Sequence, residues 1–156
     1  MNKLLDNNEL SNKAAGLFWQ DFNCAQSVLI AYSDVLQIDR EAAINLSCGF
    51  GGGMGRLQET CGAVSVAYMI FGLVNANSKD NPEKVEKTYG MVQSFHNRFT
   101  QLKGTTVCKA LINCDLNTEE GQNYFKTNNL KKEICEGCIR DSVKLINEII
   151  AETNGE

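Results

Sequence analysis

The sequence predicts an all-α protein, a single-domain helical bundle of five or six helices over residues 1–156. Apolar residues recur at i, i+3, i+4 and i+7 in four separate segments, the spacing of helices that bury one face. No segment alternates apolar and polar residues as a half-buried strand does. With 156 residues, of which 43% are hydrophobic, the chain is long enough to bury a core.

The four apolar stripes predict four of the helices directly. Each stripe spans several turns and would place its members on one face of a helix. In chain order they are Leu10, Ala14, Leu17 and Phe18; Ala25, Val28, Leu29, Tyr32 and Leu36; Val85, Tyr89, Val92, Phe95, Phe99 and Leu102; and Ile139, Val143, Ile146 and Ile150.

Residues that begin and end helices punctuate these segments. Gly104 suits a C-terminal stop, since glycine adopts left-handed backbone readily. The run from Cys61 to Val74 has 14 residues, whereas a membrane span needs about 20, so we predict a buried core helix and no membrane insertion. The predicted N-caps are Asn23, Asp39, Thr60 and Asn81, the last followed by Pro82 at the first helical position.

The charge pattern excludes some classes of partner. The net charge is −4 and the basic residues do not cluster, so we expect no nucleic-acid partner. Residues 1–8 contain no apolar segment of the kind found in secretory signals. The expected compartment is therefore the cytoplasm.

Seven cysteines are the unusual feature of the composition. In a reducing cytosol, structural disulfides are rare, and clustered thiols more often serve redox chemistry or metal binding. The alternative is that several are small buried hydrophobic residues, as free cysteines often are. The seven are Cys24, Cys48, Cys61, Cys108, Cys114, Cys135 and Cys138.

Three of the cysteines are predicted at helix starts. Cys24 follows Asn23, Cys61 follows Thr60, and Cys108 lies shortly after Thr105 and Thr106, two further candidate caps. The free N–H groups and the dipole at a helix start lower a thiol pKa and favour the reactive thiolate. At Cys61 the surrounding apolar run opposes this effect, because burial raises the pKa.

Cys135 and Cys138 form a C-x-x-C pair near the last stripe. This spacing suits a reversible disulfide or two ligands of one metal ion. A thioredoxin-like motif would lie near a βαβ unit, and no strand is predicted here.

A glycine-rich segment follows Cys48. Its glycines can adopt positive φ and allow close backbone approach. One reading is an anion-binding or cofactor-binding nest supported by Arg56. The reading we favour is a tight link that lets helices pack around the cysteines. The candidate binding residues of this segment are Gly51, Gly52, Gly53 and Arg56.

Three motifs together resemble a family of redox-active proteins named for the C_GCAxxG_C_C pattern. They are Asn23–Leu29 (NCAQSVL), Gly49–Gly55 (GFGGGMG) and Cys61–Ser65 (CGAVS), continued by Cys108-x-x-Leu111 and by Cys138 five residues before Val143. The resemblance covers about residues 23–150 and implies four signature cysteines: Cys24, Cys61, Cys108 and Cys138. Val66 stands where the family's CGAxxG motif ends in glycine.

Three functions fit these observations. The first is a thiol redox protein, with or without oxidoreductase activity, in which the four signature cysteines converge. In this hypothesis Cys24 is the attacking thiolate and a redox partner or small molecule is the substrate. The second is a metal-binding or iron–sulfur cluster-binding electron-transfer protein, whose zinc or cluster is ligated by the same four cysteines, with Cys135 as a further candidate. The third is a non-catalytic redox-sensing module. A homodimer is a further hypothesis, since small helical proteins often pair.

Overall fold

The computed structural model describes residues 6–76 and 78–155. Within these ranges the regular structure is helical, apart from one isolated bridge between Thr60 and Val107. The all-α prediction is therefore confirmed.

The number of helices differs from the prediction of five or six, which is wrong. The described residues form nine α segments, but α4 has left-handed backbone at Gly52 and Gly53, so eight right-handed α-helices remain. Short helices lack a full apolar repeat, which is why the pattern under-counts them. The segments are α1 (Asn7–Trp19), α2 (Cys24–Leu36), α3 (Arg40–Ser47), η1 (Cys48–Phe50), α4 (Gly51–Met54), α5 (Gly62–Val74), α6 (Pro82–Lys103), α7 (Cys108–Ile112), α8 (Glu119–Thr127), η2 (Lys131–Glu136, a π-helix) and α9 (Gly137–Asn154).

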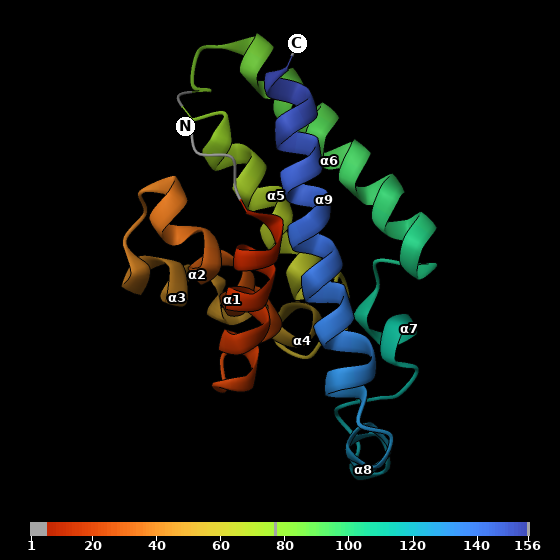
Figure 1. The fold of residues 1–156 in the computed structure, drawn as a ribbon. Helices are drawn as coiled ribbons and strands as arrows, with labels where there is room; N and C mark the ends of the chain where they lie inside the picture. The colour runs from red at the N-terminus through yellow and green to blue at the C-terminus, as the bar shows by residue number, and fades with distance from the viewer. Residues whose placement is uncertain (1–5, 77, 156) are drawn as a thin grey trace.

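The last helix, α9, is the centre of the bundle. It packs against α1, α2, α5 and α6, and Figure 1 shows it running along most of the molecule. The start of α9 lies toward the same end as α4 and α7 (Figure 1). This end of the bundle therefore brings together segments that carry cysteines far apart in the sequence.

Most of the predicted helix ends are confirmed. Asn23 forms a capping box with Gln26: its Oδ1 accepts from the Gln26 backbone N–H at 2.9 Å, and the Gln26 side chain accepts from the Asn23 N–H at 3.1 Å. Asp39 and Asn81 cap α3 and α6. Gly104 ends α6 with φ 85°.

Two predicted caps are wrong. Cys61 itself occupies the N-cap position of α5, where Thr60 was expected one residue earlier. Val107, without a side-chain hydrogen bond, takes the cap of α7 in place of the preceding threonines. Thr60 and Val107 instead pair through the isolated bridge, and this backbone pairing fixes where both helices begin.

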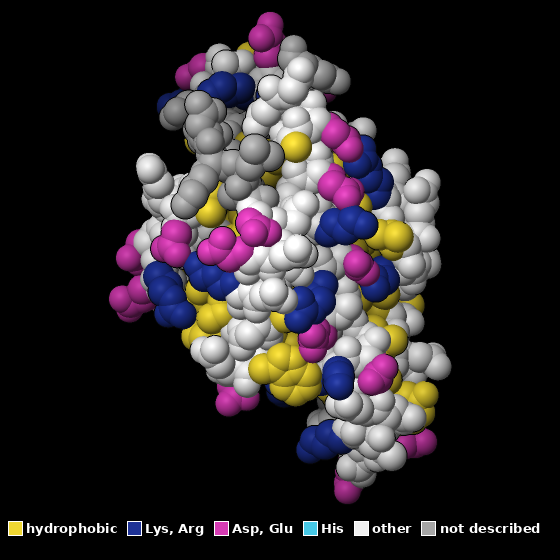
Figure 2. Space-filling model, in the orientation of Figure 1, with side chains coloured by type: hydrophobic (Ala, Val, Ile, Leu, Met, Phe, Trp, Pro, Cys, Tyr) yellow, Lys and Arg dark blue, Asp and Glu magenta, His cyan; other side chains and the backbone are white. Residues whose placement is uncertain are grey.

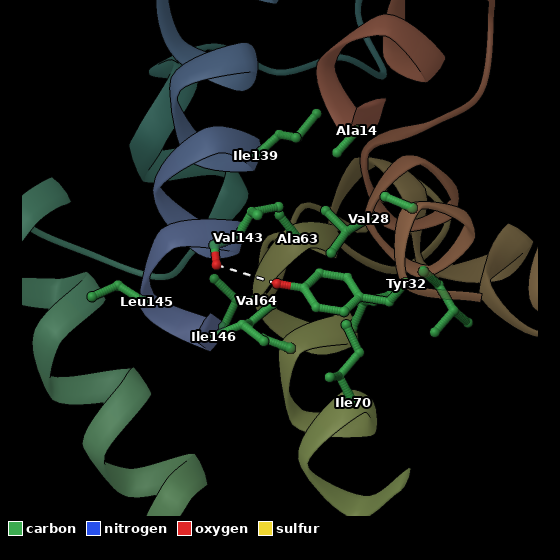
Figure 3. Close-up of a cluster of buried hydrophobic side chains, with 14 of the residues drawn as sticks. Ala14, Val28, Tyr32, Ala63, Val64, Ile70, Ile139, Val143, Leu145 and Ile146 are labelled. Atoms are coloured by element: carbon green, nitrogen blue, oxygen red, sulfur yellow. Dashed lines mark hydrogen bonds between the residues drawn. The ribbon is translucent and has the colours of Figure 1, made fainter. Parts of the chain in front are cut away.

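Tyr32 ties α2 to α9 inside the core. Its ring is fully buried, and its hydroxyl lies 3.2 Å from the carbonyl oxygen of Val143 (Figure 3). The hydroxyl also lies 2.7 Å from Oδ1 of Asn147. A buried hydroxyl needs such a partner, because leaving it unpaired costs about 1–3 kcal/mol. The apolar residues around the ring come from α1, α2, α5 and α9 (Figure 3).

The stripe predicted on α6 is only partly buried. Phe95 and Phe99 lie in the core, but Tyr89 and Leu102 are 57% and 56% exposed. One face of α6 packs against α5 and α9, and these two side chains lie outside the covered strip. Periodicity gives the face of a helix, but the neighbouring helices decide how wide the buried strip is.

No helix among the described residues is long and apolar enough to cross a membrane. On the face drawn in Figure 2, basic and acidic side chains are interspersed over the described surface, without a continuous basic patch.

Candidate functional site

Five cysteines line one cavity of about 140 Å³: Cys24, Cys61, Cys108, Cys135 and Cys138. The structure thus brings together the four signature cysteines and adds the first member of the C-x-x-C pair. Cys48 is exposed and Cys114 lies beyond the lining. The other lining residues are mostly apolar, and none is charged: Phe18, Asn23, Gly52, Gly62, Leu111, Ile112, Leu116, Phe125 and Ile134.

Three of these thiols form a continuous chain of contacts. The Cys61 thiol is in hydrogen-bonding contact with that of Cys24 on one side and that of Cys138 on the other. Cys61 is 8% exposed and Cys138 is 2% exposed, whereas Cys24 is half-buried. We call Cys24, Cys61 and Cys138 the inner thiols.

The inner thiols meet because three helices begin at the same place. Cys24 is the first residue of α2, Cys61 is the N-cap of α5, and Cys138 is the second residue of α9. The remaining two lining cysteines are supplied by α7, which starts at Cys108, and by η2, which contains Cys135. Helix packing, rather than one contiguous motif, therefore assembles the cluster.

The glycines next to the cysteines allow this close approach. A Cβ on Gly62 would lie 2.7 Å from the Cys24 sulfur, and one on Gly53 would lie 2.7 Å from Cβ of Cys108. Real Cβ atoms essentially never approach so closely, so any larger residue would push the helices apart.

The glycine-rich segment is a left-handed turn. Residues 52–56 all have φ between 62° and 67°, including Met54 and Arg56. Left-handed backbone costs an L-residue roughly 1–2 kcal/mol, which explains why glycines predominate here. Of the four candidate binding residues in this segment, only Gly52 lines the cavity, and Arg56 is exposed. The geometry supports a tight link around the cysteines and gives no support to a nest centred on Arg56.

The expected lowering of the Cys24 pKa is wrong. The hydrogen bond with Cys61 and burial raise the pKa of Cys24 well above its ordinary value. Backbone N–H groups of Gly52 and Gly62 donate to its sulfur and oppose this, but they do not outweigh it. The N–H groups at the helix start do lower the pKa of Cys24, but inside an apolar cavity the increase caused by the neighbouring thiol and by desolvation is larger.

The pKa values of Cys61, Cys108 and Cys135 shift in the same direction. The hydrogen bond to Cys138 and burial raise the pKa of Cys61, although its contact with Cys24 opposes them. Burial and the neighbouring Cys24 and Cys114 raise the pKa of Cys108 to about 11. Burial and nearby thiols raise the pKa of Cys135 to about 12, against the opposing ammonium of Lys131. At neutral pH these thiols are therefore protonated and uncharged.

The metal hypothesis finds no preformed site. Among residues 6–76 and 78–155, no three His, Cys, Asp or Glu side chains converge as ligands of one ion.

Two features of the site were not apparent from the spacing alone. Cys135 was only a secondary candidate, yet it lines the cavity with the other four. The backbone N–H of Gly62 faces the Cys24 sulfur, and the absence of a side chain at Gly62 leaves room for that sulfur. In the sequence, the only indication of this role is that Gly62 directly follows Cys61. Val66, which replaces the glycine of the family motif, is fully buried in α5 and does not line the cavity.

The fold and the site together define a helical protein with a buried cluster of thiols. The profile of the family described as "Putative redox-active protein (C_GCAxxG_C_C)" matches residues 22–149, so the chain belongs to this family. No curated protein and no solved structure matches the chain.

Proposed function

We propose that this protein is a thiol–disulfide redox protein whose inner thiols cycle between dithiol and disulfide. The observation that carries the proposal is the unbroken contact from Cys24 through Cys61 to Cys138. Thiols in mutual contact can form a disulfide with little backbone movement. The redox-active family supports this assignment.

The reaction transfers two electrons between the inner thiols and a partner disulfide. A Cys24 thiolate attacks the partner disulfide, whose S–S bond breaks, and one partner sulfur leaves as a thiolate that takes up a proton. Cys61 then attacks the sulfur of Cys24, forms the Cys24–Cys61 disulfide and releases the second partner thiol. The inner dithiol is oxidised, the partner disulfide is reduced to two thiols, and the two cysteine protons go to the products.

Cys24 is the nucleophile in this proposal for two reasons. It is the least buried of the inner thiols. The backbone N–H groups of Gly52 and Gly62 also donate to its sulfur and would stabilise a thiolate there. The raised pKa means that the thiolate is scarce at neutral pH, so slow exchange is expected until a partner or higher pH favours it.

The test is disulfide exchange in a Cys24→Ser variant. Wild-type protein, incubated anaerobically with oxidised glutathione and then alkylated, is expected to contain an intramolecular disulfide among the inner cysteines by peptide mass mapping. Cys24→Ser should lose the Cys24–Cys61 disulfide and react slower by about tenfold or more. Cys48→Ser, which removes an exposed thiol outside the cavity, is the matched control and should behave like wild type.

Metal analysis on anaerobically purified protein is the second arm of this test. Stoichiometric iron with sulfide, or stoichiometric zinc, would overturn the dithiol proposal. Exchange in Cys24→Ser at the wild-type rate would remove Cys24 from the role of nucleophile.

A further inference from the structure

The thiol cavity offers a substrate no charged partner. None of the described side chains that line it is charged, and apart from the thiols only that of Asn23 is polar. Both polar atoms of the Asn23 side chain are already engaged: Nδ2 donates to the carbonyl oxygen of Cys48 at 2.9 Å, and Oδ1 accepts from the backbone N–H of Gln26 at 2.9 Å. The described lining therefore leaves no side chain to pair with a charged group.

The one basic side chain that contacts a lining residue is engaged elsewhere. The Lys131 ammonium lies 4.8 Å from the ring centroids of both Phe18 and Trp19, a cation–π arrangement. Phe18 lines the cavity, but Lys131 is not part of the lining. Its charge is therefore not among the groups that a molecule inside the cavity would meet.

The cavity has room for a compact molecule only. Its volume is about 140 Å³, and apolar protein cavities of roughly 150 Å³ hold one benzene-sized molecule. The wall beside the half-buried Cys24 has no spare space, since a Cβ on Gly62 would lie 2.7 Å from the Cys24 sulfur. The space next to Cys24 therefore suits one half of a small disulfide.

Charge decides which compact molecules can enter this space. An ionised group that moves from water into an apolar site loses far more solvation free energy than a hydroxyl group does. A counter-charge could offset the loss, but the described lining supplies none. Substrates that carry either sign of charge are therefore disfavoured, whereas an uncharged substrate meets mainly hydrocarbon and sulfur.

We infer that the thiol cavity selects compact, uncharged disulfides as its substrates. This inference rests on the proposed dithiol–disulfide cycle and names the substrate class of the same site. The Cys24 thiolate attacks one sulfur of the small disulfide, whose S–S bond breaks, and one half leaves as a thiolate that takes up a proton. Cys61 then forms the Cys24–Cys61 disulfide and displaces the other half as a second thiol. Two electrons pass from the protein to the substrate, and the two cysteine protons go to the product thiols.

The experiment compares three disulfides of the same length on the reduced full-length protein. Hydroxyethyl disulfide is uncharged, carboxyethyl disulfide is anionic, and aminoethyl disulfide (cystamine) is cationic. Alkylation with peptide mapping follows anaerobic formation of the Cys24–Cys61 disulfide. Each rate is divided by the rate at which the same compound oxidises the urea-unfolded protein, which removes differences in intrinsic reactivity. We expect this ratio to be higher for hydroxyethyl disulfide than for either charged compound by about tenfold or more.

Leu116→Lys tests whether the lining sets this selectivity. Leu116 is half-buried in the cavity wall, and its backbone N–H donates to Oε1 of Gln58 at 2.8 Å. A lysine there adds a positive charge to the lining, so the ratio for carboxyethyl disulfide should rise by about threefold or more, and that for aminoethyl disulfide should not rise. Leu57→Lys is the matched control and should behave like wild type, since Leu57 is 74% exposed and outside the lining. Far-ultraviolet circular dichroism checks the fold of both variants.

The outcomes separate this inference from the proposed function. If neither these compounds nor prolonged incubation with oxidised glutathione produces a disulfide among the inner thiols, both are overturned. If the disulfide forms but a charged compound gives a ratio within about twofold of that for hydroxyethyl disulfide, or a higher one, only the substrate class is overturned. A folded Leu116→Lys protein with unchanged ratios would also overturn it. The wild-type comparison decides the matter by itself if Leu116→Lys does not fold.

Discussion

The backbone N–H of Gly62 donates to the sulfur of Cys24, and a Cβ atom at Gly62 would lie 2.7 Å from that same sulfur. One residue thus supplies a hydrogen-bond donor and the space for the thiol. The start of α5 is held against the start of α2 at this point, and the geometry of the inner thiols depends on it.

Gly62→Ala should destabilise the fold and displace Cys24. The new methyl group would also meet the carbonyl oxygen of Phe50 at 2.7 Å, so neither neighbour can yield easily. We expect a loss of about 1–3 kcal/mol in the free energy of unfolding, measured by urea denaturation, together with slower formation of the Cys24–Cys61 disulfide. Gly72→Ala is the control on the same helix: nothing lies within 4 Å of its Cβ, and the change should stabilise by up to about 1 kcal/mol. Equal effects at both positions would contradict the packing argument.

Gly53→Ala should be more damaging than Gly55→Ala in the same left-handed turn. Both residues have positive φ, 67° and 62°, so both changes carry the backbone cost of roughly 1–2 kcal/mol. Only Gly53 faces crowding, since its Cβ would lie 2.7 Å from Cβ of Cys108 and 2.8 Å from Cα of Gln58. The difference in unfolding free energy between the two variants measures the cost of steric crowding at Gly53. A difference near zero would contradict the argument and would show that the turn can move away from α7.

Alkylation of Cys108 should increase with pH far beyond the range of an ordinary thiol. Burial and neighbouring thiols raise its pKa to about 11, so the thiolate fraction, and with it the rate, should grow about tenfold per pH unit between pH 7 and pH 10. In urea-unfolded protein the rate should level off near pH 9, because a free thiol has a pKa of about 8.5. Native-state alkylation with iodoacetamide, followed by mass mapping, checks this. A plateau below pH 9 in the folded protein would contradict the raised pKa.

The free energy of unfolding should fall at alkaline pH. Between pH 9 and pH 11 the thiols of the unfolded chain are ionised, whereas Cys108 and Cys135 in the folded cavity keep their protons. Because the unfolded chain gains stability by releasing these protons, rising pH favours unfolding. The full free energy of unfolding is therefore retained below about pH 8.5. As pH rises from there through the folded pKa values, each thiol lowers the free energy of unfolding by about 1.4 kcal/mol per pH unit. Cys135→Ser should make the fall shallower, and Cys48→Ser should not change it.

Tyr32→Phe tests the core independently of the thiols. The change removes the hydroxyl between Val143 and Asn147 and leaves acceptors without that partner in a buried region. We expect a loss of about 1–3 kcal/mol in unfolding free energy by thermal or urea denaturation. Disulfide formation among the inner thiols should be unchanged, and a large change there would mean that the core and the cavity are coupled.

The local features of this protein followed from its sequence. The helical class, the capping box at Asn23 and the stop at Gly104 depend on residues within one or two turns, and hydrogen bonds of that range are encoded locally. The family motif also singled out four cysteines that line one cavity.

Tertiary structure alone decided the character of the thiols. The position of Cys24 at the start of α2 predicts a lowered pKa. Packing by α5 and α9 instead buries that thiol beside Cys61, so its pKa is raised. Cys135 reaches the cavity because η2 leads into α9 at this end of the bundle, and Tyr89 stays exposed because no described helix covers that part of α6. Sequence periodicity reports on contacts a few residues apart, whereas desolvation and sulfur–sulfur contact depend on helices that are tens of residues apart and meet only in the folded protein.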